Sequence, residues 1–247
     1  MFMDETKAKG IVDFTFKDVL GVGNPFTLDE IGKKLAFDIN LPKRFKDKMS
    51  GKYIWTTYNP GREDLVSTET VMEQSKKNFW ARPKRPIRSI EDIKKYWKEV
   101  AYFQADKNME STDVAESDRV YQSSGIFRSS RIYGCQNVVF SEDISRSKYI
   151  VAGYDTTAST SGIRMFQSTF CSSGYEILWS KKVSKSMFIN GSLDLYECLF
   201  CSNIESKRYC VANMQFTKEE YFEIKKIVVD WIIGSLKNDK KISITSI

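Results

Sequence analysis

Three cysteines in the C-terminal half of the chain are spaced as metal ligands often are. Two of them form a C-x-x-C pair and the third follows shortly after, at Cys198, Cys201 and Cys210. A tetrahedral zinc site needs four ligands, however, and the chain offers neither a second pair of this kind nor a histidine. Free cysteine packs as a small apolar side chain. We therefore expect a structural role for these thiols and no metal or other cofactor; zinc binding is the alternative hypothesis.

Histidine is absent from all 247 residues. Its absence excludes Ser-His and Cys-His nucleophile pairs, histidine acid–base catalysis and histidine metal ligands. Any catalysis would depend on carboxylates, lysine, tyrosine or cysteine. This composition favours a non-enzymatic function and leaves carboxylate chemistry as the alternative to examine.

Two aspartates could form a carboxylate pair. Asp155 and Asp194 follow two aromatic residues of an internal repeat, Phe140 and Trp179, at the same distance along the chain. If the repeats stack as β-coils about 4.8 Å apart, two coils would separate the carboxylates by roughly 9–10 Å. That separation is at the upper edge of the range that inverting glycosidases use. A carbohydrate-active solenoid enzyme is therefore one hypothesis, and the simpler interpretation is that aspartate recurs because it suits turns.

Positive charge is concentrated in the first half of the chain. Between Lys33 and Lys98 there are 17 basic residues against 8 acidic ones, whereas the net charge of the whole chain is +6. The excess peaks in the segment 79–88, where two prolines favour an extended backbone and the basic side chains protrude. This arm is expected to bind an acidic protein partner or a phosphate backbone; the alternative is a solvated connector.

The arm also carries two aromatic residues that are expected to be exposed. Phe79 and Trp80 could stack on a base or insert into a hydrophobic groove of a partner. The candidate binding residues of the arm are therefore Phe79, Trp80, Arg82, Lys84, Arg85 and Arg88.

The second half of the chain contains an internal repeat: an aromatic residue, three residues, Ile or Val, four residues, and a second aromatic residue. Three copies begin at Phe140, Trp179 and Phe200. Their spacing predicts a β-solenoid with coils of about 20 residues and three short strands per coil. Stacked coils bury each other's inward side chains and pair their backbone edges. In this alignment Cys210 replaces an inward apolar residue and Cys201 a small corner residue. An antiparallel β-sandwich is the alternative fold.

Capping boxes predict where two helices begin. Thr27 with Glu30 opens the first, and Thr217 with Glu220 opens the second. The second helix is expected to cap the last coil of the solenoid and to end with Gly234 as its C′ residue. A third helix begins at Ser89, because apolar residues follow it at helical spacing.

These elements together predict an α+β protein. Its mixed, basic N-terminal section covers residues 1–110, with a strand over 52–58 and a turn at 59–61. The segments that follow are the β-solenoid body over 111–216, the capping helix over 217–236, and a polar tail over 237–247 with a short strand at 242–247.

Targeting signals are not recognisable in the sequence. No run of 18 or more apolar residues occurs, so a membrane span is not supported. The first residues lack the apolar core of a signal peptide, and five cysteines do not form a disulfide framework in a chain of this length. We expect a cytoplasmic location or a place in a virion, without secretion by a standard signal and without a membrane partner.

The second half of the chain also resembles an uncharacterised family of repeat proteins from candidate-phylum bacteria. The resemblance lies mainly in residues 118–221 and is most specific in the closing segments Ser206–Cys210 and Asn213–Tyr221. The stretch 50–60 is similar to a segment that precedes the repeats in that family. The cysteine-rich, zinc-ribbon-like start of the family is missing here. No activity is known for the family, so the resemblance implies the repeat fold and no function.

The sequence therefore favours a non-enzymatic structural or interaction protein that belongs to a larger assembly, such as a virion or similar particle. Its expected partners are proteins, with a homo-oligomer included. A nucleic-acid-associated protein that uses the basic surface of residues 33–98 is the first alternative, and the carbohydrate-active enzyme is the second.

Overall fold

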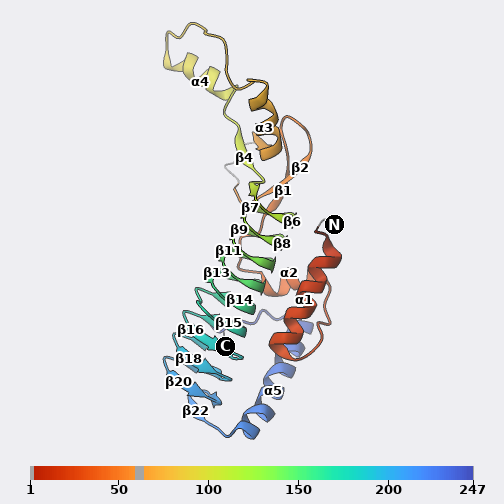
Figure 1. Ribbon diagram of the computed structural model, residues 1–247, viewed down its shortest axis with the longest axis vertical. Coiled ribbons are helices and arrows are strands. Elements are labelled where there is room, and N and C mark those ends of the chain that lie inside the picture. Colours follow the sequence, from red (N-terminus) through yellow and green to blue (C-terminus); the bar gives the residue numbers. More distant parts are fainter. Residues whose placement is uncertain (1–2, 59–63, 247) are drawn as a thin grey trace.

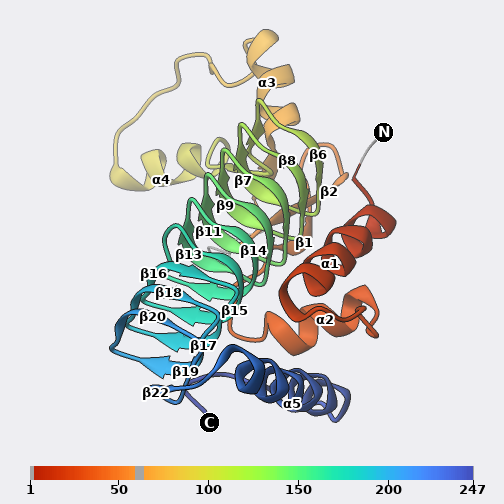
Figure 2. The same ribbon diagram turned by 60° about the horizontal axis from the view of Figure 1, so that its bottom comes forward.

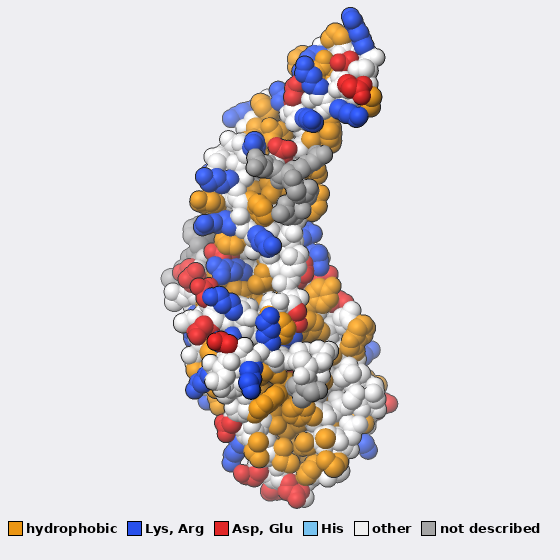
Figure 3. All heavy atoms as spheres, turned by 180° about the vertical axis from the view of Figure 1, so that it is seen from behind, with side chains coloured by type: hydrophobic (Ala, Val, Ile, Leu, Met, Phe, Trp, Pro, Cys, Tyr) orange, Lys and Arg blue, Asp and Glu red, His pale blue; other side chains and the backbone are white. Residues whose placement is uncertain are grey.

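The computed structural model describes residues 3–58 and 64–246 of the chain. The molecule is long and narrow, with a column of stacked strands in its middle, helices along one side of the column and a thin extension at one end (Figure 1). Turning the molecule shows that α1, α2 and α5 lie on the same side of the column (Figure 2). Seen from behind, the extension projects beyond the body (Figure 3). The predicted α+β solenoid fold is confirmed.

Five helices and 22 strands make up the described chain. The helices are α1 (Glu5–Leu20), α2 (Leu28–Leu35), α3 (Thr68–Lys76), α4 (Ile90–Lys98) and α5 (Lys218–Lys237). The strands before the column are β1 (Lys43–Lys46), β2 (Tyr53–Thr56), β3 (Leu65–Ser67) and β4 (Phe103–Ala105). The strands of the column are β5 (Asn108–Met109), β6 (Thr112–Ala115), β7 (Asp118–Tyr121), β8 (Ser124–Phe127), β9 (Ser130–Tyr133), β10 (Gln136–Val139), β11 (Glu142–Ser145), β12 (Lys148–Val151), β13 (Tyr154–Thr157), β14 (Thr160–Phe166), β15 (Ser172–Leu178), β16 (Lys181–Ser184), β17 (Met187–Asn190), β18 (Leu193–Tyr196), β19 (Leu199–Ser202), β20 (Glu205–Arg208), β21 (Cys210–Val211) and β22 (Met214–Gln215).

The column is a parallel β-solenoid in which each coil takes twelve residues, so that bonded groups of neighbouring coils are twelve positions apart. The strand pairs show the same register, for example Val138 with Ile150 in β10 and β12, and Ile177 with Ile189 in β15 and β17. Most coils hold two short strands, one on each side. The longer, three-stranded coil expected from the sequence is therefore wrong, although the solenoid itself is correct and the antiparallel sandwich is excluded. The intervals between the aromatic repeats are multiples of three residues but not of twelve, so the copies do not occupy the same position in different coils.

A backbone pattern of period three explains the short coil. Every third residue from Glu110 to Ala212 has a positive φ, so the chain bends in the left-handed region four times in each coil. Most of these residues are not glycine, and a non-glycine residue in this region is uncommon elsewhere in proteins. Each bend turns the chain by one side of a small, four-sided cross-section. The interior of such a coil is accordingly narrow.

Residues that follow the bends point inward, and large apolar side chains alternate among them with small ones. Over the first coils the large ones recur at every sixth position as Val120, Ile126, Ile132, Val138, Ile144 and Ile150. The small ones between them are mostly serine, buried at Ser117, Ser123, Ser129, Cys135, Ser141, Ser147 and Ser159. The alternation then shifts by three positions, because Met165 fills the space beside Gly162, where an added Cβ would lie 1.8 Å from the Met165 sulfur.

The inward serines pair backbone groups that the strands cannot pair. The Ser141 hydroxyl accepts a hydrogen bond from the Gly153 N–H, one coil further on, at 3.0 Å. It also donates to the Val139 carbonyl at 3.0 Å. The Ser129 hydroxyl does the same for the Ser141 N–H, and the Cys135 sulfur accepts from the Ser147 N–H at 3.4 Å. Because buried backbone N–H groups must be paired, the narrow coil requires a small acceptor side chain at these positions.

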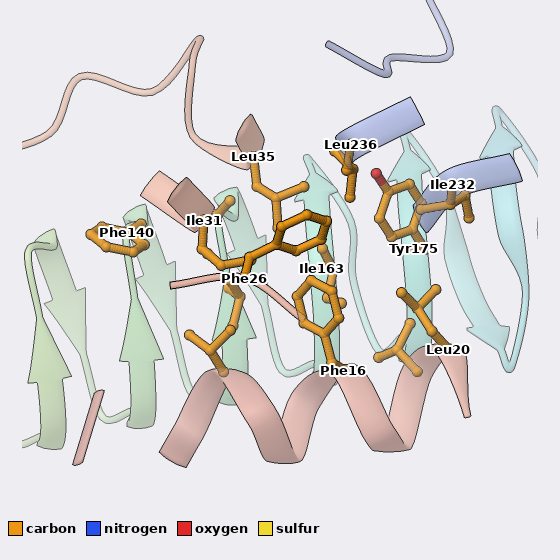
Figure 4. Close-up of a cluster of buried hydrophobic side chains, with 14 of the residues drawn as sticks. Phe16, Leu20, Phe26, Ile31, Leu35, Phe140, Ile163, Tyr175, Ile232 and Leu236 are labelled. Carbon is orange, nitrogen blue, oxygen red and sulfur yellow. The ribbon is translucent and has the colours of Figure 1, made fainter. Parts of the chain in front are cut away.

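A second set of apolar residues forms a column on one outer face of the solenoid, with one residue contributed by each coil. Seven of them are buried: Phe127, Val139, Val151, Ile163, Tyr175, Met187 and Leu199. Figure 4 shows how α1, α2 and α5 cover this face with Phe16, Ile31 and Ile232 among others. The helices are not separate from the solenoid, since their core and this face form one cluster of buried side chains. Burial of this amphipathic face stabilises α1 and α2 more than their own propensities can.

A buried ion-pair network fastens α2 and the C-terminal segment to the same face. Arg164 and Glu176, both 1% exposed, form an ion pair at 2.5 Å between Nε and Oε2. The Arg164 guanidinium also contacts both carboxylate oxygens of Asp38, at 2.8 and 3.0 Å, just after α2. The second Glu176 oxygen accepts from the Ser243 hydroxyl and the Ile244 N–H. The guanidinium and both carboxylates therefore have partners, as buried charges require.

The predicted helices form where the capping boxes place them. Thr27 with Glu30, Ser89 with Asp92 and Thr217 with Glu220 each complete a capping box. Helix α5 starts beside the last coil and runs back along the side of the solenoid (Figure 1). It continues past the predicted end at Gly234 to Lys237, with Asn238 as its C-cap. The edge of the last coil is covered by β22, which pairs antiparallel with β21.

The C-terminal tail is not a strand. Residues 242–246 form turns and coil in place of the predicted strand. Ile242 is buried against the helices and the outer face, at 3% exposure. The segment is therefore held by packing and by its bonds to Glu176.

The other end of the solenoid carries a small module built from β1–β4 and the extension. The predicted strand over 52–58 is present as β2, while the predicted turn at 59–61 lies outside the described residues. Asp47, 1% exposed, accepts hydrogen bonds from the N–H groups of Met49, Ser50 and Ser67 and from the Thr70 hydroxyl. Burial alone would raise the pKa of Asp47, but these bonds hold it far below its usual range.

Asp118 joins this module to the first coils. Its carboxylate accepts from the Thr56 hydroxyl of β2 at 2.6 Å and from the Lys107 N–H at 2.8 Å. Asp106 lies beside it in a left-handed conformation and bonds the Asn108 side-chain amide at 2.7 Å. Burial, and secondarily the Asp118 charge, raise the pKa of Asp106 to about 6. An acidic side chain is therefore held at the junction at a cost in stability.

We predict that Ser141→Ala lowers the free energy of unfolding by about 1–3 kcal/mol, because it leaves the buried Gly153 N–H without an acceptor. Ser141→Cys is the matched control and should lose less, since Cys135 shows that a thiol can accept the same bond. Urea unfolding monitored by circular dichroism measures both. Equal losses for the two variants would show that the hydroxyl bond is not what matters.

We predict that Asp106→Asn raises the melting temperature at pH 8 and changes it little at pH 4.5. The folded-state pKa of about 6 lies above the ordinary value near 3.9. The stability that a raised carboxyl pKa contributes is present at low pH and is lost as the pH rises through about 6. Asparagine also tolerates the left-handed backbone. Asp155→Asn, an exposed left-handed position, is the control. A variant that is destabilised at pH 8 would contradict this assignment.

Candidate docking groove at the tip

The extension, here called the tip, consists of α3, the arm of residues 77–89 and α4. Ser67 caps α3 and Ser89 caps α4, and the Asp92 carboxylate reaches back to the N–H groups of Arg88 and Ser89. The arm leaves α3, runs outward and returns along α4 (Figure 1). The tip therefore contains the whole predicted binding segment.

The arm is fastened to α4 and does not extend freely into solvent. Arg85 donates to both oxygens of Glu99, at 3.1 and 2.9 Å, and its guanidinium lies 3.9 Å from the centre of the Tyr96 ring. The Tyr96 hydroxyl donates to the Pro86 carbonyl at 3.2 Å. The Arg85 guanidinium lowers the pKa of Glu99 through this pair. The two prolines and these contacts preorganise the space between arm and helix.

Phe79 and Trp80 anchor the base of the arm. Both are half-buried, so the expectation that they are exposed is wrong. The Trp80 indole N–H donates to the Val71 carbonyl at 3.2 Å, and its ring lies 5.7 Å from that of Tyr102. The Arg82 guanidinium covers the Phe79 ring at 4.7 Å. Each ring therefore already has a partner within the tip.

A groove of about 450 Å³ lies between the arm and α4. Its lining is mostly apolar or aromatic, with basic residues from the arm: Trp80, Arg82, Pro83, Lys84, Arg85, Ile87, Ile93, Tyr96, Trp97 and Val100. None of the nine residues of α4, all of which the structure describes, is buried. Ile93 is 47% exposed and Trp97 57%, with Ile87 of the arm at 59%. An amphipathic helix normally buries such a face; here the arm covers Tyr96, and nothing in the described chain covers Ile93 and Trp97.

Two cations without an acidic partner line this groove. Among the described residues, Arg82 and Lys84 form no ion pair or hydrogen bond with an acid, whereas Lys95 and Lys98 lie on the far side of α4 from Ile93 and Trp97. Basic, acidic and hydrophobic side chains lie next to each other over the tip (Figure 3). Of the predicted residues, Arg82, Lys84 and Arg85 line the groove, while Arg88 follows Ile87 at its edge. The sequence interpretation missed Ile87, Ile93 and Trp97, because helical periodicity does not reveal whether an apolar face is covered.

The three candidate metal-binding cysteines lie inside the solenoid. Cys198, Cys201 and Cys210 are at most 2% exposed, and their sulfurs contact backbone carbonyls or Gln215. No group of three or more potential metal ligands occurs within the described residues. Both Cys201 and Cys210 point inward, but the predicted assignment is reversed. Cys201, predicted at a corner, pairs with Ile189 among the large apolar residues, because the coil has twelve residues and not about 20.

Cys135 is a further interior thiol whose environment is shown by its burial and its bonds. Burial raises the pKa of Cys135 to about 11. This cysteine is 1% exposed and accepts the Ser147 N–H, so it acts as a serine substitute in the hydrogen-bonding ladder. Burial, the bond it accepts and the raised pKa all favour a structural role for this thiol.

Asp155 and Asp194 do not form a pair. Both are exposed, left-handed residues, but their separation along the chain is not a whole number of coils, so they occupy different corners of the cross-section. Three coils at about 4.8 Å place them roughly 14 Å apart or more along the axis. Asp194 instead accepts from the Ser206 hydroxyl, one coil away, at 3.0 Å. The shared register on which the carbohydrate-active hypothesis depended is therefore wrong.

Comparison of the chain with protein-family models, with curated proteins and with solved structures finds no match. Among the described residues, no helix is both long and apolar enough to cross a membrane. The function of the tip must therefore be argued from its own chemistry.

We predict that Glu99→Gln loosens the arm and speeds tryptic cleavage after Lys84 and Arg88 by roughly threefold, because it weakens the bidentate bond to Arg85. The melting temperature should stay unchanged, since the pair is exposed and distant from the solenoid core. Glu91→Gln is the control on the same helix; its carboxylate is 3.8 Å from Lys94. Equal cleavage of wild type and Glu99→Gln would mean that the pair does not hold the arm.

Proposed function

We propose that the protein is a non-enzymatic interaction protein that docks through its tip onto a protein partner within a larger assembly. The observation that carries this proposal is the apolar face of α4, where Ile93 and Trp97 are about half-exposed beside a groove lined by the cations Arg82 and Lys84. The fold itself leaves Ile93 and Trp97 uncovered among the described residues. An exposed apolar patch of this kind is typical of an interaction site.

The covered ends of the solenoid support a partner other than a second copy stacked end to end. Bare strand edges are what joins solenoids into filaments. Here β22 pairs with β21 at one end, and at the other end β2 contacts the first coils through Thr56 and Asp118. The last edge is thus paired, and the first coils carry the module of β1–β4 beside them. We infer that assembly proceeds through the tip and not through the sheet.

The body of the molecule suits a spacer. Each coil pairs its backbone with the next, and the interior has an apolar core and paired polar groups. A rod built in this way holds the tip at a fixed distance from the helix-covered face. No step of catalysis is needed for this function, and the inward serines and cysteines already serve the fold.

We predict that the protein purified gently from the cells that encode it elutes at a mass above the 28.6 kDa of one chain and carries a protein partner. The double variant Ile93→Ser, Trp97→Ala should elute as a single chain, because it removes exposed groove residues without touching a buried one. Ile90→Ser, equally exposed but outside the groove, is the control. Light scattering and mass spectrometry measure mass and partner. A wild-type protein that elutes as a clean monomer would contradict the proposal.

Nucleic-acid binding stays a separate prediction with less support. The cations of residues 33–98 do not form one surface, because Lys34 is buried beside α5 and donates to the Leu236 carbonyl while the arm lies at the tip. If binding depends on phosphate contacts, the logarithm of the binding constant falls linearly with the logarithm of the salt concentration. Absence of any mobility shift at low salt would remove this alternative.

A further inference from the structure

We infer that the occupant of the tip groove is an acidic, amphipathic segment of a protein partner. This inference rests on the proposed function and adds the chemistry of the partner to it. Three properties of the groove lead to it: its apolar lining, its concave and fastened shape, and the sign of its unpaired charges.

The apolar lining requires apolar anchors from the ligand. Ile87, Ile93 and Trp97 line the groove and are each about half-exposed or more. Aliphatic side chains offer no surface on which a base can stack, and Trp80 is already bonded to Val71. Trp80 and Tyr96 have ring or cation contacts within the tip, and of the described aromatic residues in the groove Trp97 alone offers an uncontacted ring to a base. Leucine-like side chains from a partner would instead bury the isoleucines, and burial of each releases free energy in proportion to its apolar area.

The concave shape favours a polypeptide segment over a membrane surface. The apolar residues of the groove lie between two walls, the arm and α4, and the arm is fixed by Arg85 with Glu99 and by Tyr96 with Pro86. A bilayer interface takes up a convex apolar face, whereas a groove between two chain segments accepts a helix or strand that inserts side chains. The volume of about 450 Å³ is that of a site for a few side chains.

The cations of the groove that lack an acidic partner determine the expected sign of the partner's charge. The acidic residues of the tip are largely occupied, since Glu99 bonds Arg85, Asp92 caps α4 and Glu91 lies near Lys94. Arg82 and Lys84, which line the groove, have no such partner among the described residues. A carboxylate beside each apolar anchor would meet these cations, speed association and exclude basic competitors.

The test is the binding of a fluorescein-labelled peptide of about four helical turns, with leucines at positions i, i+3, i+4 and i+7 and glutamates elsewhere. Three other probes are a scrambled peptide of the same composition, an oligothymidine, and vesicles that contain phosphatidylserine. Anisotropy and vesicle flotation measure binding to the full-length protein. We expect saturable binding of the amphipathic peptide, weakened several-fold between about 50 and 200 mM salt.

Matched variants locate the binding site. Ile93→Ser should weaken peptide binding at least tenfold, and Ile90→Ser, outside the groove, should leave it unchanged. Lys84→Glu should weaken it several-fold, whereas Lys218→Glu on α5 should not. Unchanged circular dichroism confirms that each variant is folded, which is expected because none of the substituted residues is buried.

Three outcomes would overturn the inference. Equal binding of the scrambled peptide would show that charge alone acts. Binding of oligothymidine or vesicles in place of the peptide, with the same dependence on Ile93, would assign the groove to nucleic acid or to lipid. Failure of the amphipathic peptide to bind, while the native protein still carries a partner that the Ile93→Ser, Trp97→Ala variant loses, would refute the acidic segment and leave the proposed function intact.

Discussion

The left-handed bend at every third position is the constraint that determines the rest of this molecule. It closes a coil in only twelve residues, so the interior has room for large side chains on two opposite sides and small ones on the other two. Each non-glycine residue in that region costs on the order of 1 kcal/mol or more. Pairing with the coils before and after, and burial of the inward residues, must offset this cost in every coil. The bend pattern and the stacking therefore exist only together.

The same constraint explains the polar interior. A chain that bends so often cannot pair all of its N–H groups with carbonyls, and the inward serines supply the missing acceptors. Serine and cysteine fit because their side chains are short enough for a narrow coil. The buried hydroxyls are thus a requirement of the backbone geometry, and their regular recurrence in the sequence is its signature. They should not be mistaken for nucleophiles.

A constant coil length also aligns side chains outside the coil. It stacks Val139, Val151 and Ile163 into a continuous apolar column on which α1, α2 and α5 lie. In the next outward-facing column, Arg164 replaces an apolar residue and forms an ion pair with Glu176 one coil later. The pair binds Asp38 and the C-terminal segment to the solenoid. The Tyr175 hydroxyl beside this pair has no partner among the described residues, so the packing of its ring outweighs an unpaired polar atom.

Local signals in the sequence were sufficient for part of this fold. Thr27, Ser89 and Thr217 open helices because a capping box is a contact between near neighbours in the chain, which needs no tertiary information. The coil period was missed because the aromatic repeat compares unlike positions: Phe140 is 1% exposed and Trp179 65%, although both occupy bends. The repeat interval therefore reflects the three-residue spacing of the bends and not the twelve-residue length of the coil. At the tip, the arm and α4 were both predicted, but the groove between them depends on Arg85 reaching Glu99, a contact that spacing alone does not reveal.

What distinguishes the tip from other exposed apolar residues is clustering. Trp179 is more exposed than Ile87, Ile93 or Trp97, yet lysines follow it at positions 181 and 182, and single exposed apolar residues are normal on a protein surface. Ile87, Ile93 and Trp97 share one groove, and the helix that carries two of them contributes nothing to the core. A capping box and a bidentate ion pair hold this helix in place although it buries none of its residues, so these contacts stabilise an exposed surface and not a core. That use of stabilising contacts is the physical reason to look for a partner there.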